Sequence, residues 1–90
     1  MISERSAKTL ALLSTQRARA LLTALESGKR SAGELAAAGI DYSVASRTLS
    51  AMVVAGLVAV PDAVSVAARL EQATLTVAAR LAEIGAEVVA

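Results

Sequence analysis

The sequence has no Cys, His, Trp or Phe, and only one Tyr and one Pro among its 90 residues. Without Cys and His there can be no disulfide, no thiolate or imidazole metal site, no Cys nucleophile and no His-centred catalytic triad. Charged residues make up only 19% of the chain, so we expect it to fold rather than remain disordered. We therefore expect neither an enzyme, nor a cofactor, nor a transition-metal site.

Long hydrophobic runs are also scarce. The densest apolar stretch covers about a dozen residues, 49–60, and ends at Pro61 and Asp62. A bilayer span needs about 20 apolar residues. The N-terminal letters MISERSAK are not followed by an apolar segment of the signal-peptide type. The sequence predicts a soluble, cytoplasmic protein with no membrane partner.

The small size of the chain limits its core. At 9.1 kDa it forms one domain, whose core must be built from Leu, Val, Ile and Ala. A domain of this size buries only about 60–65% of its unfolded surface, and oligomerisation is a common remedy for such a core. We expect part of the apolar surface to be buried against a second copy of the chain.

Charge is unevenly distributed along the chain. Residues 1–50 hold seven Lys or Arg and four Asp or Glu, while residues 51–90 hold two and four. The N-terminal part is therefore the one suited to a polyanion.

The spacing of apolar residues predicts helices over residues 3–13, 15–27 and 32–38. Ser14 is expected to cap the second helix, and Ser31 with Glu34 forms a capping box at the start of the third. That third helix should direct Leu35 and Ala36 inward and end at Gly39.

A further helix is predicted over residues 42–55, after a four-residue bridge and with Asp41 or Ser43 as its cap. It should end at Gly56. Its inward residues are Ala45, Leu49, Met52 and Val53. A helix, a tight Gly-containing turn and a second helix is the arrangement that DNA-reading proteins use.

The C-terminal part predicts a small hairpin and a long helix. Residues 57–60 are apolar and β-branched, and Pro61-Asp62 forms a turn before residues 63–66, which either complete a two-stranded hairpin or begin a helix. An apolar stripe with steps of three and four then predicts one helix of about six turns over residues 66–88. The stripe consists of Val66, Leu70, Ala73, Val77, Leu81, Ile84 and Val88.

Four segments occur in a recognisable order: STQRARALL from Ser14, SAGELA from Ser31, SVASRTL from Ser43 and AGLV from Ala55. Over about residues 12–60 this order resembles the ArsR-type winged-helix transcriptional repressors. The resemblance implies a mainly α winged helix-turn-helix with a short or vestigial β-hairpin and a long C-terminal dimerisation helix. It further implies a dimeric, cytoplasmic and nucleoid-associated regulator of transcription, with double-stranded DNA as its partner.

The resemblance implies that the helix over residues 42–55 enters the major groove of DNA. Tyr42, Ser43, Ser46 and Arg47 would then face outward and contact base edges or phosphates. Without DNA, Arg47 is a solvated surface residue and Tyr42 a cover for the turn between two helices, and both interpretations stay open.

Four other cations in the N-terminal part are candidate phosphate contacts. Arg17 and Arg19 lie on the outer side of their helix, and Lys29 and Arg30 come just before a helix N-terminus, which favours anions. Simple solvation is the alternative for all four.

The same family dimerises through its first and last helices, which here would cover residues 1–13 and 66–88. The expected interface residues are Leu10, Leu13, Leu70, Val77, Leu81, Ile84 and Val88. Two features depart from the family pattern: the turn over residues 60–64 carries Asp62 and no cation, and Val53 and Val54 stand where charged residues are usual. An alternative is therefore a winged-helix protein-interaction module that does not bind DNA.

Overall fold

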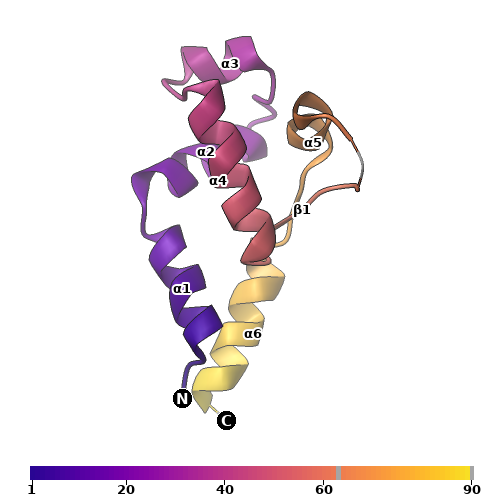
Figure 1. Ribbon diagram of the computed structural model, residues 1–90. Helices are drawn as coiled ribbons and strands as arrows, with labels where there is room; N and C mark the ends of the chain where they lie inside the picture. The colour runs from indigo at the N-terminus through magenta and orange to yellow at the C-terminus, as the bar shows by residue number, and fades with distance from the viewer. Residues whose placement is uncertain (63, 90) are drawn as a thin grey trace.

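A computed structural model describes residues 1–62 and 64–89, and this part of the chain contains six helices and one two-stranded sheet. The elements are α1 (Glu4–Leu13), α2 (Gln16–Glu26), α3 (Ala32–Ala37), α4 (Tyr42–Val54), β1 (Val58–Ala59), α5 (Val66–Gln72), β2 (Thr74–Leu75) and α6 (Val77–Val89). The molecule is elongated, with extents of 44 × 27 × 19 Å. In Figure 1, α2, α3 and α4 form the body, α5 lies to one side, and α1 and α6 extend together to the end where both termini lie.

Side-chain caps start the N-terminal helices close to their predicted positions. Thr15 rather than Ser14 caps α2, because the Thr15 hydroxyl accepts from the backbone N–H of Ala18 whereas Ser14 closes α1. The capping box of Ser31 and Glu34 is present at α3. The hydrogen bonds from Ser31 lower the pKa of the Glu34 carboxyl.

The helices α3 and α4 both end at a glycine in the left-handed conformation. Gly39 and Gly56 both have a φ of +80°, a backbone conformation that glycine adopts at little cost. The N–H of Ile40 donates to the Leu35 carbonyl at 2.8 Å, and the N–H of Leu57 donates to the Met52 carbonyl at 2.9 Å. Each turn thereby satisfies an orphan carbonyl and directs the next apolar side chain into the core.

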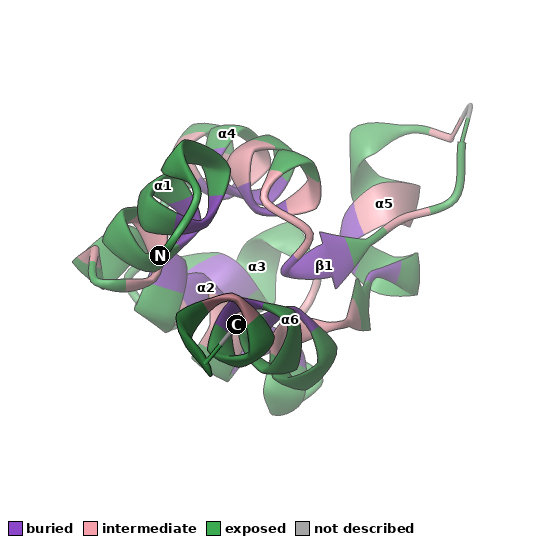
Figure 2. Cartoon of the chain, turned by 90° about the horizontal axis from the view of Figure 1, so that it is seen from below, coloured by how far each residue is buried: buried purple, intermediate pink, exposed green. Residues whose placement is uncertain are grey.

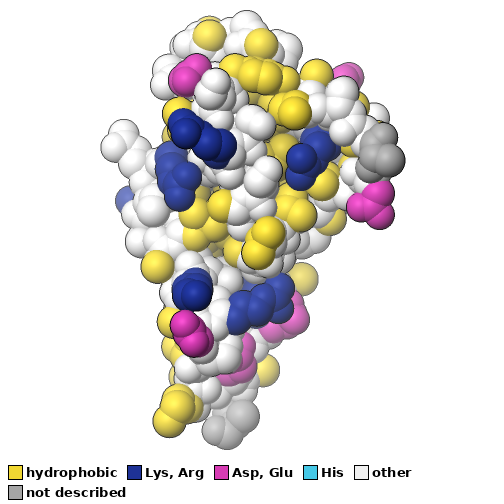
Figure 3. Space-filling view, viewed as in Figure 1, with side chains coloured by type: hydrophobic (Ala, Val, Ile, Leu, Met, Phe, Trp, Pro, Cys, Tyr) yellow, Lys and Arg dark blue, Asp and Glu magenta, His cyan; other side chains and the backbone are white. Residues whose placement is uncertain are grey.

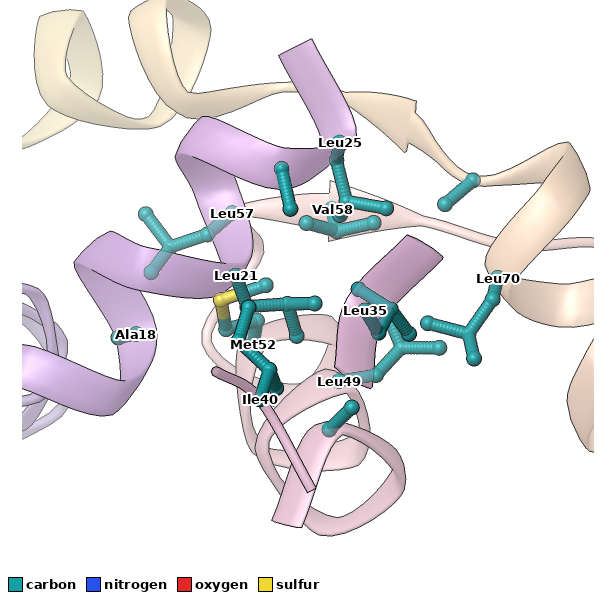
Figure 4. Close-up of a cluster of buried hydrophobic side chains, with 13 residues drawn as sticks. Ala18, Leu21, Leu25, Leu35, Ile40, Leu49, Met52, Leu57, Val58 and Leu70 are labelled. Carbon is teal, nitrogen blue, oxygen red and sulfur yellow. The ribbon is translucent and has the colours of Figure 1, made fainter. Parts of the chain in front are cut away.

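The core lies between α2, α3, α4, β1 and α5 (Figure 4). Its fully buried large side chains are Leu21, Leu25, Leu35, Leu49, Met52, Leu57 and Leu70. Figure 2 shows the purple buried faces of the helices turned toward one another. The predicted inward residues of α4 are confirmed, with Val53 partly buried, whereas Ala36 of α3 is exposed because this short helix presents only Leu35 to the core.

The first strand of the predicted hairpin pairs with a later segment than the predicted one. β1 is antiparallel to β2, with Val58 opposite Leu75 and Ala59 opposite Thr74. Of the expected second strand over residues 63–66, Val66 instead begins α5, and position 63 lies outside the described residues. The two strands are therefore joined by a connection that contains a helix.

The prediction of one continuous helix over residues 66–88 is wrong. α5 ends at Gln72, and residues 73–76 are extended where β2 pairs with β1. The N–H of Thr76 donates to the Leu57 carbonyl at 3.0 Å, and its hydroxyl donates to the Gly56 carbonyl at 2.8 Å. These bonds hold a Thr-rich stretch in the extended conformation that β-branched residues favour.

In residues 1–62 and 64–89, no helix combines the length and the apolar character that crossing a membrane requires.

Candidate nucleic-acid interface

α4 carries an anchored face and a solvent-facing side. Ala45, Leu49 and Met52 are at most 1% exposed and fix the helix against the core. Ser43 and Arg47, one turn apart, are exposed. A hydroxyl and a guanidinium thus project from a helix that its other side holds in place.

Tyr42 and Ser46 are only half-buried, and Tyr42 packs against the core. Together with Ser43 and Arg47 they line a shallow hollow of about 440 Å³, which Val66 of α5 closes on one side. The structure therefore brings together the four outward residues predicted for this helix. The sequence pattern assigns Val66 to a C-terminal helix and does not indicate that this residue would lie beside α4.

Arg17 and Arg19 of α2, and Lys29 after it, line hollows beside the turn between α3 and α4. Arg17 is exposed and shares a hollow of about 540 Å³ with Asp41 and Val44, at the start of α4. Arg19 and Lys29 line a second hollow, of about 510 Å³, beside this turn. The guanidinium of Arg19 also donates to a carbonyl at the end of α1 at 3.2 Å. Arg17 is therefore the α2 cation that borders α4.

The Arg30 guanidinium donates hydrogen bonds to backbone carbonyls of the chain itself. Its Nη1 donates to the carbonyls of Leu70, Glu71 and Ala73 at 3.3, 3.0 and 2.7 Å, and its Nη2 donates to the carbonyl of Leu25 at 3.1 Å. The side chain caps the end of α5 and joins it to α2. The phosphate contact predicted for Arg30 is incompatible with this geometry, so the residue leaves the candidate interface.

The carbonyls at the C-terminal end of α4 are satisfied by side chains from both ends of the chain. The Arg5 guanidinium of α1 donates to the Val54 carbonyl at 3.2 Å. The Arg80 Nε of α6 donates to the Ala55 carbonyl at 3.0 Å. A cation at a helix C-terminus is also favoured by the helix dipole. Local sequence patterns could not predict these contacts, because the partners are 49 and 25 residues apart.

A polar cluster joins α1 to α6. The Ser6 hydroxyl donates to the Glu87 carboxylate and accepts from Arg80 Nη2 at 3.2 Å, while the backbone N–H of Ser3 donates to Glu87 at 2.9 Å. The hydrogen bond from Ser6, followed by those from Ser3, lowers the pKa of the Glu87 carboxyl to about 2. Arg80 is 5% exposed, so the cluster fixes the two helices as one arm.

The predicted dimer-interface residues fall into three groups. Leu10, Leu81 and Val88 are exposed on the arm. Leu13 and Val77 are partly buried against the core. Leu70 and Ile84, at 0% and 4% exposed, are buried within the chain itself, so neither is available to a partner. Leu70 differs from the prediction because the helix breaks after Gln72 and α5 packs into the core.

Within the part of the chain that the structure describes, no group of three or more carboxylates is placed to hold a metal ion. No family model, curated protein or solved structure matches this chain. Any function must be argued from the geometry of the chain's own residues.

Proposed function

We propose that the chain is a dimeric, sequence-specific DNA-binding regulator of transcription, a repressor of winged-helix type, that reads the major groove with α4. The observation that carries this proposal is the side of α4 occupied by Ser43 and Arg47. Both project into solvent from a helix whose opposite side is fixed in the core and which follows α3 through a tight Gly39 turn. Side chains on a fixed helix can meet base edges in a defined register.

The charge distribution supports the same surface. Arg47 on α4, Arg17 beside its N-terminal end, and the pair Arg19 and Lys29 are exposed cations in the N-terminal half. Cations of this kind neutralise phosphates and give binding that weakens steeply with salt. Base contacts from Arg47 and the serine hydroxyls would add sequence preference.

The connection between β1 and β2 has a smaller role in this proposal. A basic wing would reach the minor groove, but the exposed Pro61 and Asp62 after β1 carry no positive charge, and the helix α5 follows from Val66. We therefore assign the DNA contacts to α4 and α2.

We assign pairing with a second copy to the arm formed by α1 and α6. Leu10, Leu81 and Val88 are 37%, 41% and 57% exposed, which leaves an apolar face without a cover. Two copies joined there would present two α4 helices, which must lie about 34 Å apart to enter successive major grooves.

The dimer is tested with Leu81→Asp, which places a carboxylate in the proposed apolar contact. Sedimentation should then report the mass of a single chain for Leu81→Asp and twice that mass for the parent. Ala79→Asp, on another exposed flank of α6, is the charge-matched control and should remain dimeric. A Leu81→Asp protein with the parent's mass would contradict this interface.

DNA binding is tested by fluorescence anisotropy with a labelled random duplex over a salt series. We expect affinity to fall steeply with salt, and Arg47→Ala to cost about 1–3 kcal/mol of binding free energy on a selected sequence. Lys8→Ala, which removes the same charge from α1, is the control. No binding at low salt, or equal losses for the two variants, would remove α4 as the reading helix.

A protein-interaction module is the second candidate function. The observation in its favour is the set of exposed apolar side chains, such as Val54 at 76% and Val89 at 85%, on a chain with a net charge of only +1. Absence of DNA binding even at low salt would favour this alternative.

A further inference from the structure

A groove of about 750 Å³ lies between α1 and the C-terminal half of α4. Its apolar walls include Leu12, Ala51, Val54 and Ala55. Among the described residues, those that line it include neither Arg47 nor the exposed Leu10, Leu81 and Val88 of the arm. The groove therefore shares α1 with the arm but uses none of the side chains assigned above to DNA or to the dimer. Figure 3 shows hydrophobic side chains exposed between groups of Lys and Arg side chains on this face of the molecule.

Two cations of α1 stand at this groove. Arg5 is held in place because its Nη2 donates to the Val54 carbonyl at 3.2 Å. Within residues 1–62 and 64–89, its Nε and Nη1 make no hydrogen bond, so N–H donors remain for an oxygen anion. Lys8 has only an exposed ion pair with Glu4, at 3.5 Å, which contributes little.

We propose that this groove binds a monocarboxylate with an unbranched aliphatic tail. The carboxylate would accept hydrogen bonds from Arg5 and Lys8, and the tail would lie against Leu12, Ala51 and Val54. The volume falls in the range of small-molecule sites, and apolar walls with a few polar groups at one place are typical of such sites. With Glu4 included, the described lining residues carry a net charge of +1, which matches a single anionic headgroup.

A second copy of the chain suits the groove less well. A symmetric pair seated here would bring together two linings that each carry a net charge of +1. An amphiphile with a positive headgroup would meet the same repulsion, and a neutral one would leave the Arg5 donors unused. The charge therefore selects the anion.

Calorimetry with decanoate, decan-1-ol and decyltrimethylammonium, each below its micellar concentration, tests this inference on the free protein without DNA. We expect decanoate to bind with 1:1 stoichiometry and about tenfold more tightly than the alcohol, because a charge-assisted hydrogen bond is lost in the alcohol. The cation should not bind. Dodecanoate should gain up to about fourfold for each added methylene. Equal affinity for all three headgroups, or no binding of decanoate, would overturn the proposal.

Variants locate the site. Ala51→Leu fills the groove from a helix position that tolerates Leu, and it should abolish decanoate binding while the helical circular dichroism is retained. Lys8→Gln should weaken binding by about two- to fivefold, whereas Lys29→Gln, a cation outside the groove, should not. Unchanged binding by both Ala51→Leu and Lys8→Gln would overturn the assignment. A changed sedimentation mass for Ala51→Leu, without decanoate binding to the parent, would instead identify a second copy as the occupant.

Discussion

Replacing Arg80 by Met is the sharpest test of how the arm is joined to α4. The variant keeps an unbranched apolar stem but loses the guanidinium, which donates to the Ala55 carbonyl at 3.0 Å and to the Ser6 hydroxyl at 3.2 Å. Because the side chain is only 5% exposed, water cannot replace these bonds without a rearrangement. The variant therefore removes the connection while largely preserving the packing volume.

The expected loss follows from the contacts. Each hydrogen bond from a charged donor contributes about 1.5–3 kcal/mol, and a cation at a helix C-terminus adds about 0.3–1 kcal/mol. The Thr9 hydroxyl lies 3.4 Å from the Ala55 carbonyl, but its single proton has a closer acceptor in the Arg5 carbonyl at 3.0 Å, so it offsets at most a small part of the loss. We expect the free energy of unfolding to fall by about 3 kcal/mol for Arg80→Met, out of about 5–13 kcal/mol for a domain of this size.

Urea denaturation followed by far-ultraviolet circular dichroism measures this loss. With a slope of about 1 kcal/mol per molar urea for a small chain, the midpoint should fall by about 3 M. Arg17→Met, at an exposed position of α2, is the control and should change the free energy by less than about 0.5 kcal/mol. A midpoint for Arg80→Met within that margin of the control would refute the role assigned to the guanidinium.

Three further predictions concern other contacts. Arg30→Met should lower the free energy of unfolding by about 2–4 kcal/mol and speed hydrogen exchange in α5, because four carbonyls each lose a hydrogen bond from a charged donor. Gly56→Ala should destabilise the protein by about 1–3 kcal/mol in thermal unfolding, since φ is +80° and the added Cβ would stand 3.1 Å from Arg80 Cδ. Glu87→Gln should lower Tm at neutral pH. Because the folded pKa of Glu87 is about 2 against an ordinary 4.5, this difference is complete above about pH 4.5 and disappears as the pH falls toward 2.

Each of the three has a matched control. Lys29→Met changes an exposed neighbour of Arg30 and should be nearly neutral. Gly33→Ala places a methyl group where nothing lies within 4 Å, inside α3, and should stabilise by about 0.5–1 kcal/mol. Glu83→Gln, an exposed position one turn from Glu87, should change Tm at neutral pH by less than Glu87→Gln does. An equal loss of unfolding free energy for Lys29→Met and Arg30→Met would contradict the role of the Arg30 guanidinium. Equal effects of Gly33→Ala and Gly56→Ala on stability would contradict the strain at Gly56. A Tm difference for Glu87→Gln that does not change with pH would contradict the hydrogen bonds of Glu87.

The N-terminal part could be predicted because its signals are local. The capping box of Ser31 with Glu34 and the left-handed glycines at positions 39 and 56 act within a few residues, and each is present in the structure. The apolar stripe of α4 likewise selects the buried residues Ala45, Leu49 and Met52. The resemblance, and not the periodicity alone, named Ser43 and Arg47 as outward residues, and both are exposed in the structure.

The C-terminal part could not be predicted because its decisive partners are distant in sequence. The three- and four-residue steps of the apolar stripe continue across Ala73, although the chain is extended there to pair β2 with β1. Only the β-branched Thr74, Thr76 and Val77 hinted at a break. In the sequence, Arg30 and Arg80 look like any other cations. No local pattern indicates that they donate hydrogen bonds to backbone carbonyls 25 to 43 residues away.

The side chains that close the C-terminal end of α4 have a consequence for the order of folding. Helices α2, α3 and α4 precede residue 80 in the chain and can assemble before it is synthesised, so the Ala55 carbonyl receives Arg80 only afterwards. On the ribosome, the Ala55 carbonyl would therefore stay without its Arg80 partner until residue 80 emerges. Contacts that form late in folding mainly lower the unfolding rate. The contacts between the arm and α4 should therefore slow unfolding more than they speed folding.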